Sequence, residues 1–347
     1  MKNMINLKKI FNGKAILITG GTGFLGRSLV KEIAKFQPQS IRIFSRDELK
    51  HYEMEGKMGK DYPTEKIRHF VGDVRDYERL LKATKGVDIV IHAAALKRID
   101  MIEYNVEESI KTNVLGTMNV ARACIQNNVE TAIFVSTDKA CSPINTYGAG
   151  KFMGERIFIE SNYSKGPART KFIIVRYGNV IDSTGSVIPF FMDKIKKNQT
   201  IPLTSDKMTR FIITPPQAVD LIFNAIYYGQ GGEIFVPKLP AMKLPDLVEI
   251  LMEKAGMNPQ IKITGLRPGE KIDELMINES EVPRTYEFNK MYVIVSVIEQ
   301  SKPWHKQVKG MAWVKKGKKL NKNFKEYSSR EACLPKEEIK KILNPLI

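Results

Sequence analysis

The sequence predicts an α/β fold, in which a Rossmann-type doubly wound parallel sheet carries a smaller α+β substrate-binding lobe. Between residue 14 and about residue 180, short apolar runs of strand length alternate with stretches of helical periodicity. A glycine-rich loop joins the first apolar run to the first helical stretch, as is typical of sheets that bind dinucleotides. After residue 180 the pattern loosens, and glycine and proline separate short elements, which indicates a loop-rich lobe.

The alternation defines the expected elements in order. The strands are 15–19, 41–44, 67–71, 88–92, 131–136 and 172–177. The helices are 24–36, 76–83, 106–127 and 145–162. We expect residues 1–180 to form an NADP-binding domain, residues 181–300 to form mainly a substrate-binding lobe with some return to the core, and residues 301–347 to form a basic C-terminal segment. Ligands of such a sheet bind beyond the carboxyl ends of its strands, so the residues that follow each strand are the first candidates for a site.

The loop after strand 15–19 is the first candidate. Its glycines allow a tight turn, the close approach of a pyrophosphate, and close packing of helix on strand. The residues expected to contact a dinucleotide are Gly20, Thr22, Gly23, Phe24, Leu25 and Gly26. Strand, loop and helix in this order make the prediction much more specific than the glycines alone.

The next strand ends favour NADP over NAD. An acidic residue directly after the second strand usually binds the adenosine ribose of NAD, whereas here Ser45 and Arg46 come first and Lys50 follows. The alternative is that Arg46 and Lys50 are ordinary solvated charges. Further cofactor contacts are expected from the later strand ends, at Asp73 and Val74 near the adenine and at Ala93, Ala94 and Ala95 near the nicotinamide ribose.

Residues 136–151 carry the most chemical information. Tyr147 and Lys151 are four apart, so they share one face of the predicted helix. A nearby ammonium favours phenolate, and we therefore expect Lys151 to lower the pKa of Tyr147 and to make it a base for a sugar hydroxyl. The spacing alone is weak evidence, because Tyr62 with Lys66, among others, has it too.

Composition excludes several classes of protein. A hydrophobic content of 43% argues against disorder, and no apolar run approaches the roughly 18–20 residues of a membrane span. Three cysteines without Cys-x-x-Cys spacing suit a reducing compartment, so we expect a cytoplasmic protein. Four scattered histidines predict no metal site.

The net charge of +17 is concentrated at the C-terminal end. Residues 301–347 hold 13 Lys and Arg against 4 Asp and Glu. The run 315–319 has almost no interleaved aromatic residues, which favours a solvated basic tail over a nucleic-acid site. A nucleic-acid binder remains an alternative that rests on this tail alone.

The motifs resemble those of a known family. The segment 19–26 together with Tyr147 and Lys151 resembles the extended short-chain dehydrogenase/reductase superfamily. Eight further motifs resemble the inverting UDP-N-acetylglucosamine 4,6-dehydratases, lyases that begin pseudaminic acid synthesis for flagellin and other surface glycans. They are 45–50, 72–76, 93–97, 136–140, 176–180, 208–211, 232–237 and 267–271. The sequence departs from the family at 182–187, where an arginine is missing.

The resemblance implies roles for individual residues. Tyr147 would take the C4 hydroxyl proton while hydride leaves to NADP, Lys139 would take the C5 proton, and Asp138 would protonate the departing C6 hydroxyl. The implied catalytic residues are Thr137, Asp138, Lys139, Tyr147 and Lys151, and further cofactor contacts are Lys97, Val135, Ser136 and Val180. The implied substrate contacts are Lys97, Asn179, Val187, Ile188, Thr204, Arg210, Arg267 and Glu270.

The Asp138–Lys139 pair sets a physical condition on this mechanism. The acid must start protonated and the base neutral, whereas opposite charges favour ionisation of both. Only a closed, dry pocket gives the required states, because burial raises the pKa of a carboxyl group and lowers that of an amine. A simple ion pair at a strand end is the structural alternative.

Other functions remain open at this stage. The family resemblance also admits a dehydratase/5-epimerase of capsule or O-antigen synthesis, although Tyr147 and the turn 267–269 place the chain nearer the pseudaminic branch. A simple nucleotide-sugar 4-epimerase and a non-catalytic NADP-binding regulator are two more alternatives. The resemblance further implies a homo-oligomer, either a dimer or a hexamer.

Overall fold

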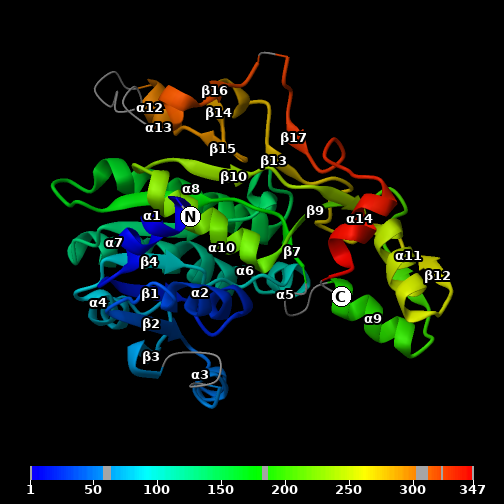
Figure 1. Ribbon diagram of the computed structural model, residues 1–347, viewed down its shortest axis with the longest axis horizontal. Helices are drawn as coiled ribbons and strands as arrows, with labels where there is room; N and C mark the ends of the chain where they lie inside the picture. The colour runs from blue at the N-terminus through cyan, green and yellow to red at the C-terminus, as the bar shows by residue number, and fades with distance from the viewer. Residues whose placement is uncertain (1, 58–63, 182–186, 302–311, 322, 346–347) are drawn as a thin grey trace.

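The computed structural model describes residues 2–57, 64–181, 187–301, 312–321 and 323–345 (Figure 1). A ten-stranded sheet forms the main body, and a smaller lobe built from later parts of the chain lies beside it. The family departure at 182–186 lies outside the described residues.

The main sheet has the strand order β16-β14-β15-β10-β6-β5-β4-β1-β2-β3. Its parallel strands are β1 (Ala15–Thr19), β2 (Ser40–Ser45), β3 (Ile67–Val71), β4 (Ile89–His92), β5 (Thr131–Val135), β6 (Lys171–Val175) and β10 (Ile234–Pro237). Its antiparallel strands are β14 (Thr285–Phe288), β15 (Met291–Ile294) and β16 (Lys318–Lys319). The order 3-2-1-4-5-6 reverses direction between β1 and β4, and ligands bind at such a switch point.

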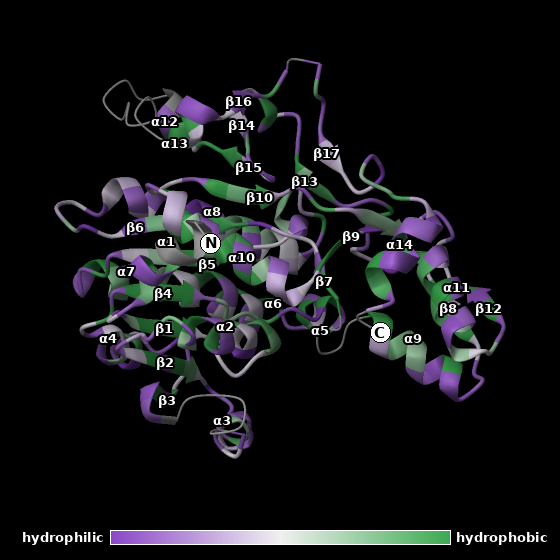
Figure 2. Cartoon of the chain, viewed as in Figure 1, coloured by the Kyte–Doolittle hydropathy of each residue, from purple (hydrophilic) through white to green (hydrophobic). Residues whose placement is uncertain are grey.

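Helices cover the sheet. One group is α1 (Lys2–Phe11), α2 (Phe24–Ala34) and α10 (Pro215–Tyr228), in which α10 packs against both of the others. A second group is α4 (Tyr77–Thr84), α7 (Gly116–Gln126) and α8 (Thr146–Ser164), in which α7 packs between α4 and α8. Shorter helices are α3 (Glu48–Glu55), α5 (Ile99–Tyr104), α6 (Val106–Ser109), α12 (Val297–Ser301) and the 3₁₀ turns Thr64–Lys66 and Val282–Arg284. Figure 2 shows hydrophobic residues along the central strands, and β1, β4 and β5 are buried throughout.

The predicted elements of the first half are confirmed, with boundaries that differ by at most two residues, except for one helix. The helix expected over 106–127 is interrupted by a π-helical turn, Ile110–Leu115, between α6 and α7. A π turn adds a residue to the helical ring and often marks a functional site. Here it turns Asn113 toward the backbone of Leu96, to which the Asn113 amide makes two hydrogen bonds, of 2.8 and 2.9 Å.

The smaller lobe has a core of its own. Its sheets pair β7 (Asn179–Val180), β9 (Thr209–Ile213) and β11 (Ala241–Lys243), and separately β8 (Ile201–Leu203) with β12 (Ile261–Ile263). Its helices are α9 (Val187–Lys196), α11 (Leu244–Ala255) and α14 (Lys336–Leu343). A further pair, β13 (Leu275–Ile277) with β17 (Tyr327–Ser328), joins residues far apart in the sequence. The second hydrophobic cluster contains buried residues of α9, α11 and α14.

The expected solvated basic tail is confirmed for the lysine run 315–319, whereas other described parts of the C-terminal segment pack against the fold. Trp313, in α13 (Ala312–Lys316), is fully buried, and its ring packs edge-on against Tyr286 of β14. Strand β16 extends the main sheet, and α14 packs on α11. Seven basic residues of the described part of this segment are exposed as expected, at 315, 316, 318, 319, 325, 330 and 341. Tertiary packing of a few apolar residues, chiefly Trp313, Ile339 and Leu343, therefore outweighs the basic composition.

Within the described part of the chain, none of the helices combines the length and the apolar character needed to cross a membrane.

Candidate active site

The glycine loop has the geometry of a dinucleotide cradle. Gly20 has φ +70°, and a Cβ atom there would lie 2.9 Å from the Cα of Ala94, so only glycine lets the loops after β1 and β4 approach this closely. Gly23 caps α2 without a side-chain hydrogen bond. The first amide groups of α2, at Phe24, Leu25 and Gly26, therefore have no side-chain cap, and such amides bind pyrophosphate. The residues present fit a dinucleotide cofactor.

The predicted adenosine residues come together beside this loop. The Thr22 and Ser45 hydroxyl oxygens are 2.9 Å apart, and the Arg46 guanidinium lies 3.8 Å from the Asp73 carboxylate. Although burial opposes it, hydrogen bonds and charge from Arg75 lower the pKa of Asp73. Asp73 is thus ionised, as an acceptor for adenine requires.

Two other predicted cofactor residues have protein partners. The Lys50 ammonium pairs with Asp47 at 2.6 Å on the exposed start of α3. Val74 is buried beneath Gly116 of α7, where a Cβ would meet its side chain at 2.7 Å. Val74 is therefore covered by α7 and Lys50 is exposed, and contacts of either residue with a cofactor stay predictions.

The loop after β4 is held in place by two residues that sequence reasoning missed. The Thr19 hydroxyl accepts a hydrogen bond from the Ala94 amide at 3.3 Å. Asn113 clamps Leu96 from the π turn, so Ala93, Ala95 and Lys97 follow a fixed backbone. Nothing in the helical periodicity of 106–127 distinguishes Asn113, because the signal is a local irregularity of the backbone.

In the segment 137–139, Thr137 and Asp138 are buried, while 19% of the Lys139 side chain is exposed. The segment forms a 3₁₀ turn, Asp138–Ala140, directly after β5. Asp138 is fully buried, and its Oδ1 accepts hydrogen bonds from Thr137 at 2.9 Å and from the Lys139 ammonium at 3.1 Å. The burial of Asp138 agrees with the expected dry environment, and a closed pocket around 137–139 stays a prediction.

Glu274 is a third member of this cluster that the sequence did not reveal. Its Oε1 lies 3.2 Å from the Lys139 Nζ and 3.8 Å from the Arg210 Nε, and only 3% of its side chain is exposed. Asp138 Oδ2 and Glu274 Oε2 are buried without a hydrogen-bond partner among the described residues. Two oxygens of this cluster therefore have unused hydrogen-bonding capacity.

In this cluster the pKa of Asp138 shifts in the expected direction, and the pKa of Lys139 shifts in the opposite direction to that expected. Burial, assisted by the nearby Glu274 charge, raises the pKa of Asp138. Burial alone would lower the pKa of Lys139, but the charges of Asp138 and Glu274 outweigh it and raise the pKa. The expectation that burial makes Lys139 neutral is wrong here because a second carboxylate, unforeseen from the sequence, faces the amine.

Tyr147 and Lys151 also differ from expectation. Burial raises the pKa of Tyr147 to about 12, and the cation that opposes this effect is Lys139. The predicted lowering by Lys151 is wrong in this structure, since the Lys151 ammonium donates instead to the Val135 carbonyl at 2.7 Å. Burial lowers the pKa of Lys151 to about 7, against the opposing charge of Glu155.

A network of buried ion pairs and hydrogen bonds holds α8, the helix that contains Tyr147 and Lys151. The Ser136 hydroxyl donates to Glu155 at 2.7 Å, and Glu155 pairs with Arg176 at 2.7 Å. Arg176 also binds Glu281 at 2.8 Å. The predicted cofactor contact of Ser136 stays a prediction, because this structure assigns its hydroxyl to Glu155.

The turn 267–271 meets the start of the catalytic helix. The Asn145 amide donates to the Gly269 carbonyl at 2.7 Å, while its oxygen caps α8 by accepting from the Gly148 amide. Arg267 and Glu270, two predicted substrate residues, are therefore carried to the catalytic helix, and the Arg267 amide donates to Glu270 at 3.4 Å.

The remaining predicted substrate residues lie in the smaller lobe. Arg210 is buried, and its guanidinium donates to the carbonyls of Thr209, Lys271 and Ile272. Through the bonds to Lys271 and Ile272, Arg210 holds the segment that precedes Glu274. Asn179 and Val180 form β7, Val187 and Ile188 begin α9, and Thr204 follows β8 with its hydroxyl 3.5 Å from the Met208 sulfur. Direct contacts of these residues with a substrate stay predictions.

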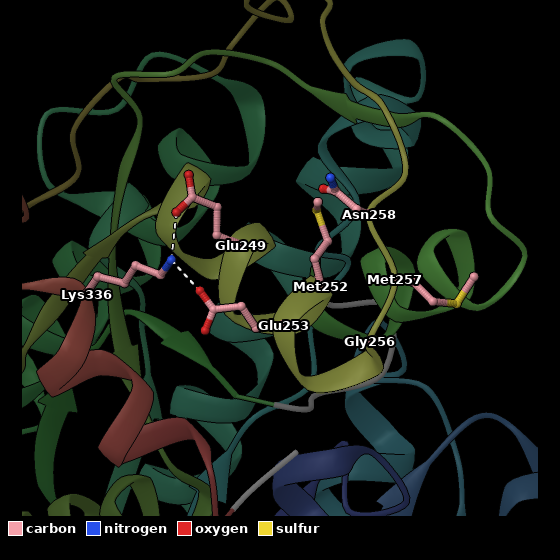
Figure 3. Close-up of a pocket in the computed structure, with 7 residues that line it drawn as sticks. All are labelled: Glu249, Met252, Glu253, Gly256, Met257, Asn258 and Lys336. Carbon is pink, nitrogen blue, oxygen red and sulfur yellow. Dashed lines mark hydrogen bonds and ion pairs between the residues drawn. The ribbon is translucent and has the colours of Figure 1, made fainter.

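A separate surface cavity of about 380 Å³ lies in the smaller lobe (Figure 3). Lys336 projects from α14 toward α11 and pairs with Glu249 at 2.8 Å and with Glu253 at 2.6 Å. None of the predicted site residues lines this cavity. Among the described residues there is also no cluster of three or more His, Cys, Asp and Glu that could hold a metal ion.

A sheet with this strand order, a glycine loop after β1 and a Tyr-x-x-x-Lys helix after β5 define a short-chain dehydrogenase/reductase fold. Residues 16–296 match the family model described as polysaccharide biosynthesis protein. The chain belongs to this family.

Individual relatives agree with this assignment. The chain is 42% identical to a UDP-N-acetylglucosamine 4,6-dehydratase (inverting) of Campylobacter jejuni, over 92% of this chain and 93% of the relative. It is 39% identical to a UDP-glucose 4-epimerase of Rickettsia bellii, over 82% and 84% of the two chains. Among solved structures, Pen from Bacillus thuringiensis superposes with a TM-score of 0.87 at 36% identity, covering 97% of this chain and 99% of that one.

Proposed function

We propose that this enzyme catalyses the NADP-dependent 4,6-dehydration of UDP-N-acetylglucosamine with inversion at C5. The product would be UDP-2-acetamido-2,6-dideoxy-β-L-arabino-hex-4-ulose. The observation that carries the proposal is the buried Asp138–Lys139 pair, placed directly after β5 and before the helix of Tyr147. Oxidation at C4 alone needs only a base, whereas loss of water from C5 and C6 needs a second base and an acid.

The hydrogen bond within this pair provides a route to the reactive state. Moving one proton along the 3.1 Å bond from Lys139 Nζ to Asp138 Oδ1 gives a neutral amine and a neutral acid. No proton enters or leaves the cluster, so the reactive form is a tautomer of the resting ion pair. The high pKa of Lys139 is therefore compatible with a role as base, at the cost of an unfavourable tautomer equilibrium.

The three residues then divide the chemistry. Tyr147 takes the proton of the C4 hydroxyl in its phenolate form, which a pKa of about 12 makes a minor species in the cofactor-free protein. A bound nicotinamide would supply the hydride acceptor at C4 and the hydride donor at C6. Lys139 takes the C5 proton while Asp138 gives its proton to the C6 oxygen, so that the C5–H and C6–O bonds break and water leaves. Reprotonation of C5 from the opposite face completes the inversion.

NADP is the cofactor that the adenosine region favours. Ser45 and Arg46 follow β2 where an acidic residue would select NAD, and Lys50 follows in α3. A 2′-phosphate would gain hydrogen bonds from the serine and charge from Arg46.

The proposal extends to a pathway and a setting. The product of such an inverting reaction is the starting compound for pseudaminic acid, a sugar of surface and flagellin glycans. We place the enzyme in the cytoplasm as a homo-oligomer that binds neither nucleic acid nor membrane. A 4-epimerase is the second candidate, because the relative from Rickettsia bears that name.

Product analysis tests the proposal. Purified enzyme incubated with UDP-N-acetylglucosamine and NADP in deuterium oxide should give a product that has lost one water and carries deuterium at C5, with NMR coupling constants of an inverted centre. The isosteric variant Asp138→Asn should lose at least about a hundredfold in rate, because an amide cannot act as the acid. A product of unchanged mass would assign the epimerase instead, and an unreacted sugar with either NADP or NAD would overturn both.

A further inference from the structure

Four side chains form a hydrogen-bonded chain that ends beside the glycine loop. The Nδ1 atoms of His69 and His51 are 2.7 Å apart, and the His51 Nε2 lies 2.8 Å from the Ser45 hydroxyl oxygen. Ser45 in turn lies 2.9 Å from the Thr22 hydroxyl. The histidines come from β3 and α3, while Ser45 ends β2. The proposed mechanism uses neither histidine.

The geometry determines which atoms carry protons. His51 Nε2 also lies 3.1 Å from the Ser45 carbonyl, which can only accept, so Nε2 carries a proton. In the neutral ring the His51 Nδ1 is then an acceptor, and the facing His69 Nδ1 donates to it. Burial lowers the pKa of His69, which agrees with a neutral donor ring. His51 is itself buried, with 5% exposure, so it cannot turn to solvent.

This arrangement assigns a direction to the Ser45 hydroxyl. Because Ser45 accepts from His51, its own proton is directed away from the histidine, toward Thr22 and the cofactor region. A phosphate group is an acceptor only, whereas a ribose hydroxyl both donates and accepts. A hydroxyl fixed as a donor therefore discriminates in favour of a phosphate.

We propose that His51, oriented by His69, is a positioning residue for cofactor specificity, which fixes Ser45 as a hydrogen-bond donor to the 2′-phosphate of NADP. This inference rests on the cofactor assignment of the proposed function and names the group that supports it. His51 itself does not touch the cofactor. It acts through Ser45, so its effect should disappear when the serine hydroxyl is removed.

Equilibrium binding of NADP and NAD, measured by calorimetry on cofactor-free protein, tests the proposal. NAD serves as an internal control, since it lacks only the phosphate. His51→Leu should weaken NADP binding about tenfold, the scale of one hydrogen bond to a charged group, and leave NAD binding within about twofold. His51→Gln, whose amide can replace the Nε2 donor, should retain most of the NADP affinity.

A double-mutant comparison separates positioning from a general structural effect. Ser45→Ala should itself weaken NADP binding, and adding His51→Leu to it should cause no further loss. Additive losses, equal losses for both cofactors, or no change in His51→Leu would each overturn the proposal. If His51→Leu does not fold, His69→Phe provides the same comparison, because it removes the partner that orients His51.

The same titrations distinguish failure of the proposed NADP specificity from failure of the proposed role of His51. A wild-type protein that binds NAD more tightly than NADP would overturn the cofactor assignment together with this inference. A wild-type preference for NADP that is unchanged in His51→Leu would overturn the inference alone.

Discussion

At the scale of single residues, Glu274 affects the protonation of Asp138 and Lys139, the proposed catalytic pair. It adds a second negative charge 3.2 Å from the Lys139 ammonium and contributes to the raised pKa of both Asp138 and Lys139. In the proposed mechanism the reactive cluster holds one proton on Asp138 and none on Lys139, so activity should fall when a proton is added or removed. We therefore expect a bell-shaped pH profile whose limbs belong to the coupled cluster.

Glu274→Gln should move both limbs of this profile to lower pH, by about one unit. Removing a negative charge favours the deprotonated form of each neighbour, so both apparent pKa values fall. The rate of product formation against pH provides the measurement. Asp273→Asn is the matched control, because Asp273 binds Thr209 and Arg330 and should leave the limbs in place. If Glu274→Gln lowers the rate but leaves both limbs of the pH profile in place, Glu274 has a structural role only.

Lys151 should make stability depend on pH. Its pKa is lowered to about 7 in the folded state and lies near 10.4 in an unfolded chain. Between these values the unfolded state binds the extra proton, so stability rises with pH by up to about 1.4 kcal/mol per unit. The stability of the wild type relative to Lys151→Met should thus increase from pH 7 to pH 10 in denaturant titrations without cofactor. A difference that stays constant with pH would contradict this.

At the scale of elements, strands were easier to predict than helices. Strands such as β1 and β5 are nearly continuous apolar runs followed by glycine or a polar residue, so their limits can be read from the local sequence. Helix α1 was missed because its lysines conceal a short apolar face, of which Phe11 packs on Phe223 of α10. Residues of the candidate site were likewise predictable only where the local sequence marks them. Residues directly after strands were found, whereas Glu274 and His51 act only through partners distant in sequence.

Asn145 joins the catalytic helix to the turn 267–271, and two substitutions separate its roles. Asn145→Ala removes both the α8 cap and the bond to Gly269, and should cost about 1 kcal/mol of stability. Asn145→Asp keeps the capping oxygen and loses only the donor to Gly269. It should keep its stability and raise the KM for the nucleotide sugar severalfold, since Arg267 and Glu270 would no longer be held against α8. Denaturation and steady-state kinetics on both variants check this, and an unchanged KM in both would refute the link.

At the scale of the whole molecule, the chain after residue 230 returns to the main sheet formed by the first half of the chain. Strands β10, β14 and β15 extend the main sheet, and Arg176, at the end of β6, binds both Glu155 of α8 and Glu281. The sequence could not predict these contacts, because a buried charged residue looks like any other Arg or Glu until its partners are known. This network connects the catalytic helix to the later half.

Arg176→Met should therefore destabilise the protein by about 3–5 kcal/mol, because it leaves two buried carboxylates without their main counter-charge. Arg156 and Arg284 remain 3.5 Å from one carboxylate each and should prevent complete unfolding. Against its burial, Arg176 lowers the pKa of Glu281, a contribution that is present above the unfolded pKa of about 4.3 and lost as pH falls. The stability of the wild type should then exceed that of Arg176→Met most at neutral pH, and the difference should narrow as the pH falls below about 4.

The control for Arg176→Met is the triple variant Glu155→Gln, Arg176→Met, Glu281→Gln, which removes the buried charges together. It should recover most of the lost stability, since neutral side chains of similar size carry no such desolvation penalty. Guanidinium denaturation of the three proteins at several pH values provides the comparison. If the triple variant is as unstable as the single one, the network stabilises the fold through shape and hydrogen bonds, and charge balance is not what joins the two halves.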